Sequence, residues 1–422
     1  MKKVISVLVV FAALTAAVFA QELKFGAYLD TGLGVVSSDI KDSDTVVKAY
    51  AVDAWQNGYR FRLNGSWTGE EKNAGIRFRL QSQSKLAAGY ISLSYLYGWV
   101  SFLDNIFTVS GGIVDDSAWQ TADFWINADA GEGLGALLKA KPVEGLDLGF
   151  GAYIASQLGG GDNNSLASTV LLDLANAVTT IGDVKYVYSA AYTLPEVFRI
   201  GASFRWKNKA GHNAAATAAP YSGRDESSAL FGDLRILAVK DLTAVVAFSF
   251  DKIEDFDNSG NITFSETFAY KIEDLGLGLN AAQFFYKRTA AGEKVDYDPG
   301  LFFNLWASYA IGKVAPRLDL VYFLGGASNP AGDYTKAKYD RHDGFAAKAS
   351  TADSDKDDYS VFSLRPSVKF NINGNASIEI GDMLNFDAAT KDGTYKKDPA
   401  DANDEGLNRI TNVFYIDFKW SF

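Results

Sequence analysis

The sequence contains no cysteine and only two histidines, His212 and His342, among its 422 residues. Without cysteine the chain cannot form a disulfide, a thiolate zinc site, an iron–sulfur cluster or a thiol nucleophile. Both histidines lie in stretches of small and polar residues, so they offer little material for a catalytic group or a histidine-based metal site. We therefore expect no enzyme.

Proline is scarce as well, with 8 residues, and stretches of helical periodicity are hard to find. In contrast, the chain holds 39 Gly, 21 Tyr and 29 Phe, which are turn residues and strand formers. The composition therefore favours an all-β protein.

Long apolar runs are confined to the first twenty residues. Lys2 and Lys3 precede an apolar stretch over 4–18, and Val18 and Ala20 are small enough for a signal peptidase. A membrane anchor is the weaker alternative, because the stretch is shorter than the ~20 residues that a spanning helix needs. We expect a signal peptide over 1–20 and a mature chain over 21–422. Loss of the two lysines would take the formal charge from −11 to −13.

The mature chain repeatedly alternates apolar and polar residues. Leu23 and Phe25 alternate with Lys24 and Gly26 at its start, and the same pattern recurs over 198–205, 317–322 and 364–370. The charged face of such strands needs water and the opposite face needs an apolar medium, as in a transmembrane barrel with a polar lumen. A large soluble β-sandwich or propeller is the alternative.

The C-terminal segment NVFYIDFKWSF places Phe414, Ile416, Phe418, Trp420 and Phe422 on one face. It resembles the final strand of bacterial outer-membrane barrels, whose aromatic alternation and terminal Phe are read by the barrel-assembly machinery. With the signal peptide and the cysteine-free body, the chain is similar to outer-membrane porins. This resemblance implies the bacterial outer membrane, contact with its lipid, and a homo-trimer; nothing points to nucleic acid.

We expect a transmembrane antiparallel up-and-down β-barrel of about eighteen strands, with sixteen as the alternative. Tight turns such as 104–105, 142–145, 240–241 and 273–274 alternate with long polar stretches, among them 37–56, 116–132, 289–299 and 327–358. This alternation is typical of periplasmic turns and extracellular loops. An even number of strands places both termini in the periplasm.

Bases outnumber acids on the face expected to line the lumen, although the whole chain is acidic. Basic side chains on a pore wall favour anions. We therefore predict an anion-preferring pore. The expected pore-lining residues are Arg60, Arg62, Arg77, Arg79, Arg199, Arg205, Arg235, Arg317, Arg365 and Lys369.

The acidic loop over 116–132 is a candidate constriction. It carries Asp116, Asp123, Asp129 and Glu132 and contains no base, so folding into the barrel would set it across from the arginines. This pairing resembles the eyelet of general porins. A solvated surface loop is the alternative, and a helix over 163–181 is a rival constriction.

The segment DFDNSGNITFSE has the spacing of a calcium-binding loop, with oxygens at Asp255, Asp257, Ser259 and Glu266. Its flanks are strands where an EF-hand needs helices, and the strand register points Glu266 towards lipid. A polar hairpin tip with chance spacing is therefore the stronger interpretation. No other cofactor is expected.

Two functions fit these observations. One is an outer-membrane porin for passive diffusion of small hydrophilic solutes. The other is a substrate-selective channel for a sugar or a small organic acid, in which Tyr28, Tyr153 and Tyr415 would provide stacking surfaces beside the basic wall.

Overall fold

A computed structural model describes the chain over its strands and short turns. The described residues are 22–40, 46–52, 59–82, 91–116, 131–154, 184–207, 228–251, 253, 261–290, 293–296, 300–325, 359–389 and 409–422.

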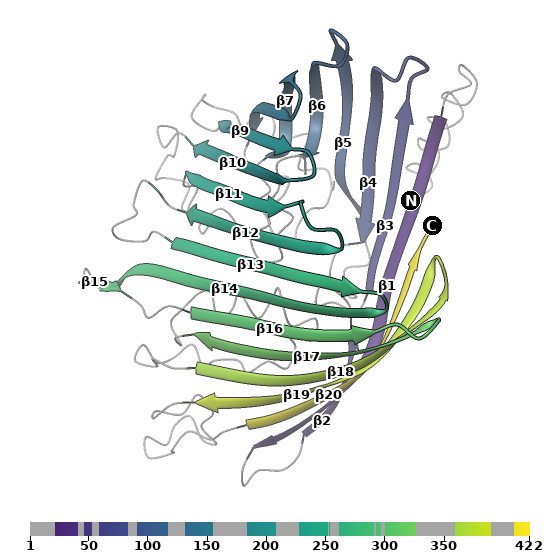
Figure 1. The fold of residues 1–422 in the computed structure, drawn as a ribbon, viewed down its shortest axis with the longest axis vertical. Coiled ribbons are helices and arrows are strands. Elements are labelled where there is room, and N and C mark those ends of the chain that lie inside the picture. The colour runs from purple at the N-terminus through teal and green to yellow at the C-terminus, as the bar shows by residue number, and fades with distance from the viewer. Residues whose placement is uncertain are drawn as a thin grey trace.

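Over these residues the chain forms a closed antiparallel barrel of eighteen strands (Figure 1). The expectation of eighteen strands is thus confirmed over sixteen. The barrel strands are β1 (Glu22–Ile40), β3 (Tyr59–Thr68), β4 (Ala74–Ser82), β5 (Ile91–Phe102), β6 (Phe107–Asp116), β7 (Gly131–Val143), β8 (Leu146–Ile154), β9 (Val184–Leu194), β10 (Phe198–Lys207), β11 (Ala229–Ile236), β12 (Leu242–Asp251), β13 (Asn261–Ile272), β14 (Leu275–Ala290), β16 (Gly300–Tyr309), β17 (Val314–Gly325), β18 (Tyr359–Asn373), β19 (Ala376–Ala389) and β20 (Arg409–Ser421).

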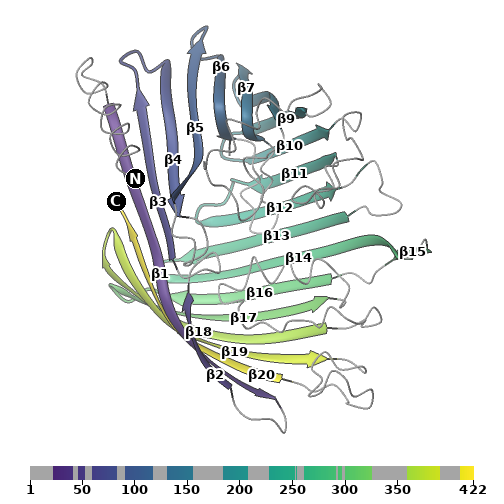
Figure 2. The same cartoon turned by 180° about the vertical axis from the view of Figure 1, so that it is seen from behind.

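The first and last strands close the barrel. β1 pairs with β20 from Tyr28 to Ile40, and with β3 along its other edge from Glu22 to Thr31. Phe422 continues the seam, because its N–H donates to the Ala27 carbonyl at 3.0 Å and its carbonyl accepts from the Ala27 N–H at 2.7 Å. Figure 2 shows β1 from behind, beside β3 and β20.

Short turns join the strands at one end of the barrel, where β1 begins and β20 ends. Asp104 and Asn105 have φ values of 54° and 64°, the left-handed backbone that tight hairpin turns require. Gly145 takes φ 79°, and a Cβ there would lie 2.3 Å from the Thr193 carbonyl oxygen. The turn residues identified in the sequence therefore mark one rim correctly.

Two expected loops contain additional strands. β2 (Val46–Val52) lies within the stretch 37–56 and pairs with the C-terminal half of β1, where Val52 is opposite Gly32. Tyr59 of β3 is opposite the next β1 residue, Thr31, so β2 and β3 together cover one edge of β1. β15 (Glu293–Asp296) lies within 289–299 and forms a hairpin with the end of β14. The stretch 37–56 was expected to be a loop. It contains the strand β2 because VVKAYAV is rich in valine, a strand-forming residue.

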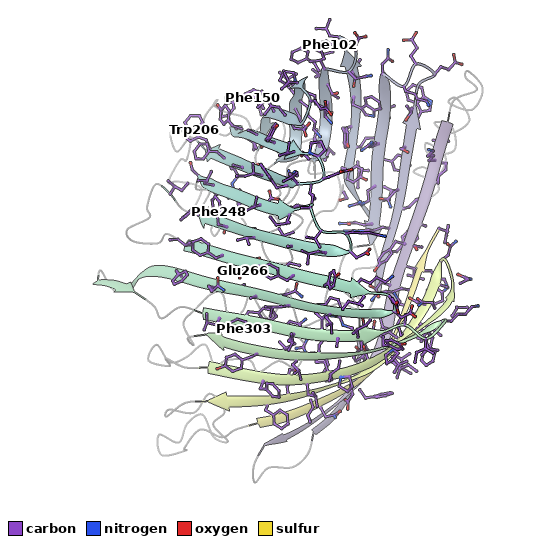
Figure 3. All side chains as sticks on the ribbon, viewed as in Figure 1. Phe102, Phe150, Trp206, Phe248, Glu266 and Phe303 are labelled. Atoms are coloured by element: carbon purple, nitrogen blue, oxygen red, sulfur yellow. The ribbon has the colours of Figure 1, made fainter. Side chains whose placement is uncertain are left out.

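Large apolar side chains cover the outer wall of the barrel. Phe102, Phe150, Trp206, Phe248 and Phe303 come from five different strands and belong to this face (Figure 3). Most such side chains are partly exposed, while Asp30, Asp233 and Asp417 on the opposite face are buried. The polarity of the barrel is therefore apolar outside and charged inside, as predicted. No helix within the described ranges is long and apolar enough to cross a membrane.

Candidate functional site

The inner wall of the barrel is the face that carries the charged side chains. Cross-strand partners lie on the same face of a sheet, and Tyr28 of β1 is opposite Arg62 of β3. The ladders then place Arg77, Arg79, Arg199 and the other expected pore-lining positions on this same face. Arg60 occupies the inner-wall position opposite Asp30. The strand register therefore places these positions on one face of the sheet.

Two arginines, one on β3 and one on β4, donate hydrogen bonds to amide oxygens. Arg79 Nε donates to Asn64 Oδ1 at 2.7 Å, and Arg62 Nε donates to Gln81 Oε1 at 3.3 Å. Arg77 is exposed and lies opposite Ser66. An amide oxygen orients a guanidinium without cancelling its charge. We call Arg62, Arg77 and Arg79 the β3–β4 basic cluster, because these three bases lie on one part of the inner wall.

A second group spans β10 and β11. The Asp233 carboxylate accepts from Arg199 Nη1 at 2.8 Å and from Arg235 Nε at 2.9 Å, and its side chain is only 2% exposed. Two guanidinium groups thus share one carboxylate. Because a buried carboxylate needs charged partners, this group holds the wall together and still retains one excess positive charge.

A third group lies on β16 and β17. Arg317 donates through Nε and Nη2 to the two oxygens of Asp319, each at 2.7 Å, in the bidentate geometry typical of this pair. The guanidinium carbon also lies 4.4 Å from the Trp306 ring centroid. Asn304 donates to Asp319 at 3.1 Å. Ring and carboxylate together hold Arg317 in one orientation.

The remaining expected bases lie nearby on the same face. Arg365 occupies the β18 position opposite Asp319, and its Nε donates to Ser363 Oγ at 2.8 Å. Lys369 is opposite Glu379 of β19. Arg205 lies over the Phe231 ring, 5.6 Å from its centroid. Basic groups therefore line the inner wall from β10 to β18 as well as at the β3–β4 basic cluster.

At the seam between β1 and β20, two carboxylates share one lysine. Lys419 Nζ lies 2.8 Å from Asp417 and 3.9 Å from Asp30, and Tyr28 donates its hydroxyl to Asp30 at 2.6 Å. Both carboxylates are buried. Tyr415, on the same strand, donates to Glu379 at 2.9 Å. Tyr28 and Tyr415 thus serve as hydrogen-bond donors to carboxylates, and the side chain of Tyr153 lies outside the described residues.

Sequence reasoning missed an apolar patch on the inner wall. Val114, Leu137 and Val187 are each 1% exposed and form one cluster, against which Tyr97 packs. They belong to β5, β6, β7 and β9. Their positions could have been found by continuing the alternation from Lys139, which shares its face with Leu137. The lumen wall is therefore partly apolar between the basic groups.

The expected constriction falls only partly within the described residues. Asp116 ends β6 opposite Gly131, and Glu132 lies opposite Asp115 at the start of β7. Asp123, Asp129 and the segment 163–181 lie outside the described residues. The constriction therefore stays a prediction.

The calcium loop is likewise described at one end only, since Asp255, Asp257 and Ser259 lie outside the described residues. Glu266 lies within β13, opposite Val246 and Ala281 on the outer wall. Its carboxylate accepts a hydrogen bond from Gln283 Nε2 at 3.1 Å. Glu266 thus faces outwards as the register predicted, and calcium binding at this loop would depend on the other three residues.

No protein-family model and no curated protein matches the sequence. Solved structures with a similar arrangement include OpdL of Pseudomonas aeruginosa, which is 11% identical, covers 94% of this chain and 99% of that one, and has a TM-score of 0.47. OccK1 (OpdK) of Pseudomonas aeruginosa is 10% identical over 94% and 99%, with a TM-score of 0.48. A loop-deletion form of OmpT of Vibrio cholerae is 12% identical over 96% and 100%, with a TM-score of 0.42.

Proposed function

We propose that the chain is an outer-membrane porin, which forms a water-filled pore for passive diffusion of small hydrophilic solutes. The observation that carries the proposal is a closed barrel with charged side chains inside and a predominantly apolar wall outside. A barrel with this polarity is stable in a bilayer, because the strands close on themselves and lipid meets mainly apolar groups. The proposal assigns no catalytic step to the chain.

The pore is anion-preferring in this proposal. At the β3–β4 basic cluster, amide oxygens accept hydrogen bonds from Arg62 and Arg79, and Asp233 is shared between two arginines. Fixed charges on a narrow wall act on passing ions more strongly than loop charges beyond the Debye length of about 8 Å at physiological salt. The basic wall thus outweighs the acidic character of the whole chain.

Reconstitution into planar bilayers tests both statements. The native protein is expected to conduct, with a reversal potential in a KCl gradient that shows chloride preference. Replacing Arg60, Arg62, Arg77 and Arg79 together by Gln keeps polarity and approximate size, so conductance should stay similar while the reversal potential moves towards cations.

The control replaces three lysines of the short turns, Lys72, Lys240 and Lys313, by Gln. This control should leave the reversal potential near the native value. A native channel that prefers cations would contradict the anion preference, and a protein that never conducts would contradict the porin function itself.

A substrate-selective channel is the second candidate, and the fixed guanidinium groups favour it. Arg79 lies 4.8 Å from the Tyr95 ring centroid and Arg317 lies 4.4 Å from that of Trp306. An oriented guanidinium recognises the two oxygens of a carboxylate, whereas a freely moving one acts as a point charge. A small organic acid would then reduce chloride current in a saturable manner. A current reduction that rises linearly with acid concentration would favour the passive porin.

Export and assembly complete the proposal. The mature protein begins at Gln21 after removal of residues 1–20, so N-terminal sequencing of protein from outer membranes should read Gln-Glu-Leu-Lys. The C-terminal strand is the segment that engages the barrel-assembly machinery, and the mature barrel assembles as a homo-trimer. Both termini lie in the periplasm. Labelling of intact cells at an engineered epitope after Phe422 should therefore fail until the outer membrane is permeabilised.

Calcium binding by Asp255, Asp257 and Ser259 is a minor part of the proposal. Calorimetric titration of the refolded protein with Ca²⁺ should give heats that disappear when both aspartates are replaced by Ala. Identical heats for native and variant proteins would remove the site.

A further inference from the structure

Glu266 presents a carboxyl group on the apolar outer wall (Figure 3). Phe264 and Phe268 flank it on β13, and both are exposed. Glu266 is opposite Ala281 of β14, and Ala281 is opposite Phe303 of β16. Phe303 is 38% exposed. Gln283 of β14 is its hydrogen-bond donor at 3.1 Å. A polar pair thus lies within an aromatic surface.

The pair is far from either rim. Glu266 is five residues from Asn261 and six from Ile272, the two ends of β13. At about 3.3 Å per residue and a tilt of ~45°, this is some 12–14 Å of depth from each rim, the middle of an apolar band ~25 Å tall. Polar groups in hydrocarbon cost several kcal/mol each when unsatisfied. Gln283 has a second amide proton and a carbonyl oxygen beyond its bond to Glu266.

A second pair of the same kind lies elsewhere on the outer wall. Asp382 of β19 is on the face of Ile380 and Leu384, and its Oδ2 accepts from Asn412 Nδ2 of β20 at 3.1 Å. Phe414, opposite Asp382, is 47% exposed. Away from the strand ends, these are the two places in the described part of the outer wall where a carboxyl group faces the membrane.

We propose that these two pairs are the contact surfaces between copies of this chain in the membrane, with Glu266 and Gln283 of one copy meeting Asp382 and Asn412 of the next. Each pair carries an amide donor and a carboxyl acceptor, so the two are complementary. Contact between two copies removes both polar pairs from lipid and gives them hydrogen-bond partners on the neighbouring copy. The inference rests on the proposed outer-membrane location.

A second copy fits better than an unrelated partner because the chain carries two surfaces of matching chemistry. A closed ring of identical subunits joins one face of each copy to a different face of its neighbour. A lone partner protein would require only one such surface. The aromatic side chains around both pairs supply the packing area that contact within a bilayer needs.

Cross-linking tests the pairing directly, since the native chain has no cysteine. Phe303→Cys marks the first surface and Phe414→Cys marks the second. In the double variant, a short membrane-permeant bis-methanethiosulfonate should join separate copies into covalent oligomers. Within one copy the two sites are four strands apart on the wall, about 19 Å, beyond the reach of a short reagent.

The matched control is Leu96→Cys combined with Phe414→Cys. Leu96 is 44% exposed on the outer face of β5, across the barrel from β13. This control and each single variant should give at most a tenth of the covalent oligomer. Equal yields from the two double variants, or none from Phe303→Cys with Phe414→Cys, would overturn the proposal.

Glu266→Leu provides a second measurement, because leucine suits a lipid-facing position and leaves the barrel intact. Native mass spectrometry should show the wild type as an oligomer and this variant as a monomer. If the Glu266→Leu variant keeps the oligomeric mass of the wild type, the proposed interface is overturned. Conductance is recorded on the same samples, so the two proposals fail separately. A monomeric wild type that conducts removes the interface and the trimer but keeps the pore, while an oligomer that does not conduct removes only the pore function.

Discussion

Gly201 lies directly opposite Asp233 on the inner wall, and a Cβ at that position would be 3.0 Å from Asp233 Oδ1. The same added atom would lie 3.2 Å from Arg199 Nη2. The absence of a side chain at Gly201 therefore leaves the space in which the guanidinium and the buried carboxylate meet. A strand glycine is ordinarily a weak choice for a sheet, and here the ion pair explains it.

Gly201→Val should destabilise the barrel, although valine is a better strand former than glycine. Its branched side chain would push Asp233 away from Arg199 and leave a buried carboxylate with one partner fewer, which costs about 1–3 kcal/mol. Urea unfolding in lipid vesicles measures the loss. Gly111→Val is the control, because the nearest atom to an added Cβ there is 4.0 Å away. Equal unfolding midpoints for the two variants would show that the space at Gly201 is unimportant.

Asp319→Asn should increase anion preference, the opposite of removing arginines. The change deletes a carboxylate that neutralises Arg317, while Trp306 and the asparagine oxygen still hold the guanidinium. A unit charge about 4 Å away is worth about 1 kcal/mol in water, so the chloride-to-potassium permeability ratio should rise roughly two- to fivefold.

The reversal potential in a KCl gradient gives this ratio. Asp147→Asn is the control, since Asp147 pairs with an exposed Lys141 at 3.4 Å beside the short turn at 144–145. An unchanged permeability ratio for Asp319→Asn would indicate that this carboxylate does not face the permeating ions.

High salt should weaken selectivity if wall charges produce it. The Debye length shrinks from about 10 Å at 0.1 M to about 3 Å at 1 M, so the field of the β3–β4 basic cluster would no longer extend across the pore. Reversal potentials are measured at one fixed KCl concentration ratio, around mean concentrations of about 0.1 M and about 1 M. At 1 M they should approach the value expected from the mobilities of the ions in bulk water. Combined replacement of Arg62, Arg77 and Arg79 by Gln should flatten this dependence. A salt-independent ratio would point to steric selection.

The sequence predicted the architecture well because barrel strands obey one simple rule. Charged and apolar residues alternate with a period of two, so the face of each residue follows from its neighbours, and the register sets Arg62 and Arg79 on one face. Turn residues at Asp104 and Asn105 then set the strand ends. The closed antiparallel barrel and its approximate strand number follow from these local signals.

Pairing across strands could not be predicted from the same pattern. That Arg199 and Arg235 share Asp233, or that Arg317 rests on Trp306, depends on which strands are neighbours and on their stagger. The apolar patch of Val114, Leu137 and Val187 was missed because the lumen was expected to be polar throughout. β2 was missed because its short pattern lies within a polar stretch.

The terminal residue has two separable roles, one in closing the barrel and one in assembly. Deleting Phe422 removes both backbone hydrogen bonds with Ala27 at the seam, whereas Phe422→Ala keeps them and removes a ring that is 77% exposed. The deletion should therefore lower stability in vesicles by about 1–3 kcal/mol, and the alanine variant by much less. In cells the alanine variant should reach the outer membrane less well, if the assembly machinery reads the ring. Unfolding midpoints and outer-membrane yields measure the two roles independently. Equal midpoints for the deletion and the alanine variant would show that the seam hydrogen bonds of Phe422 do not contribute to barrel stability.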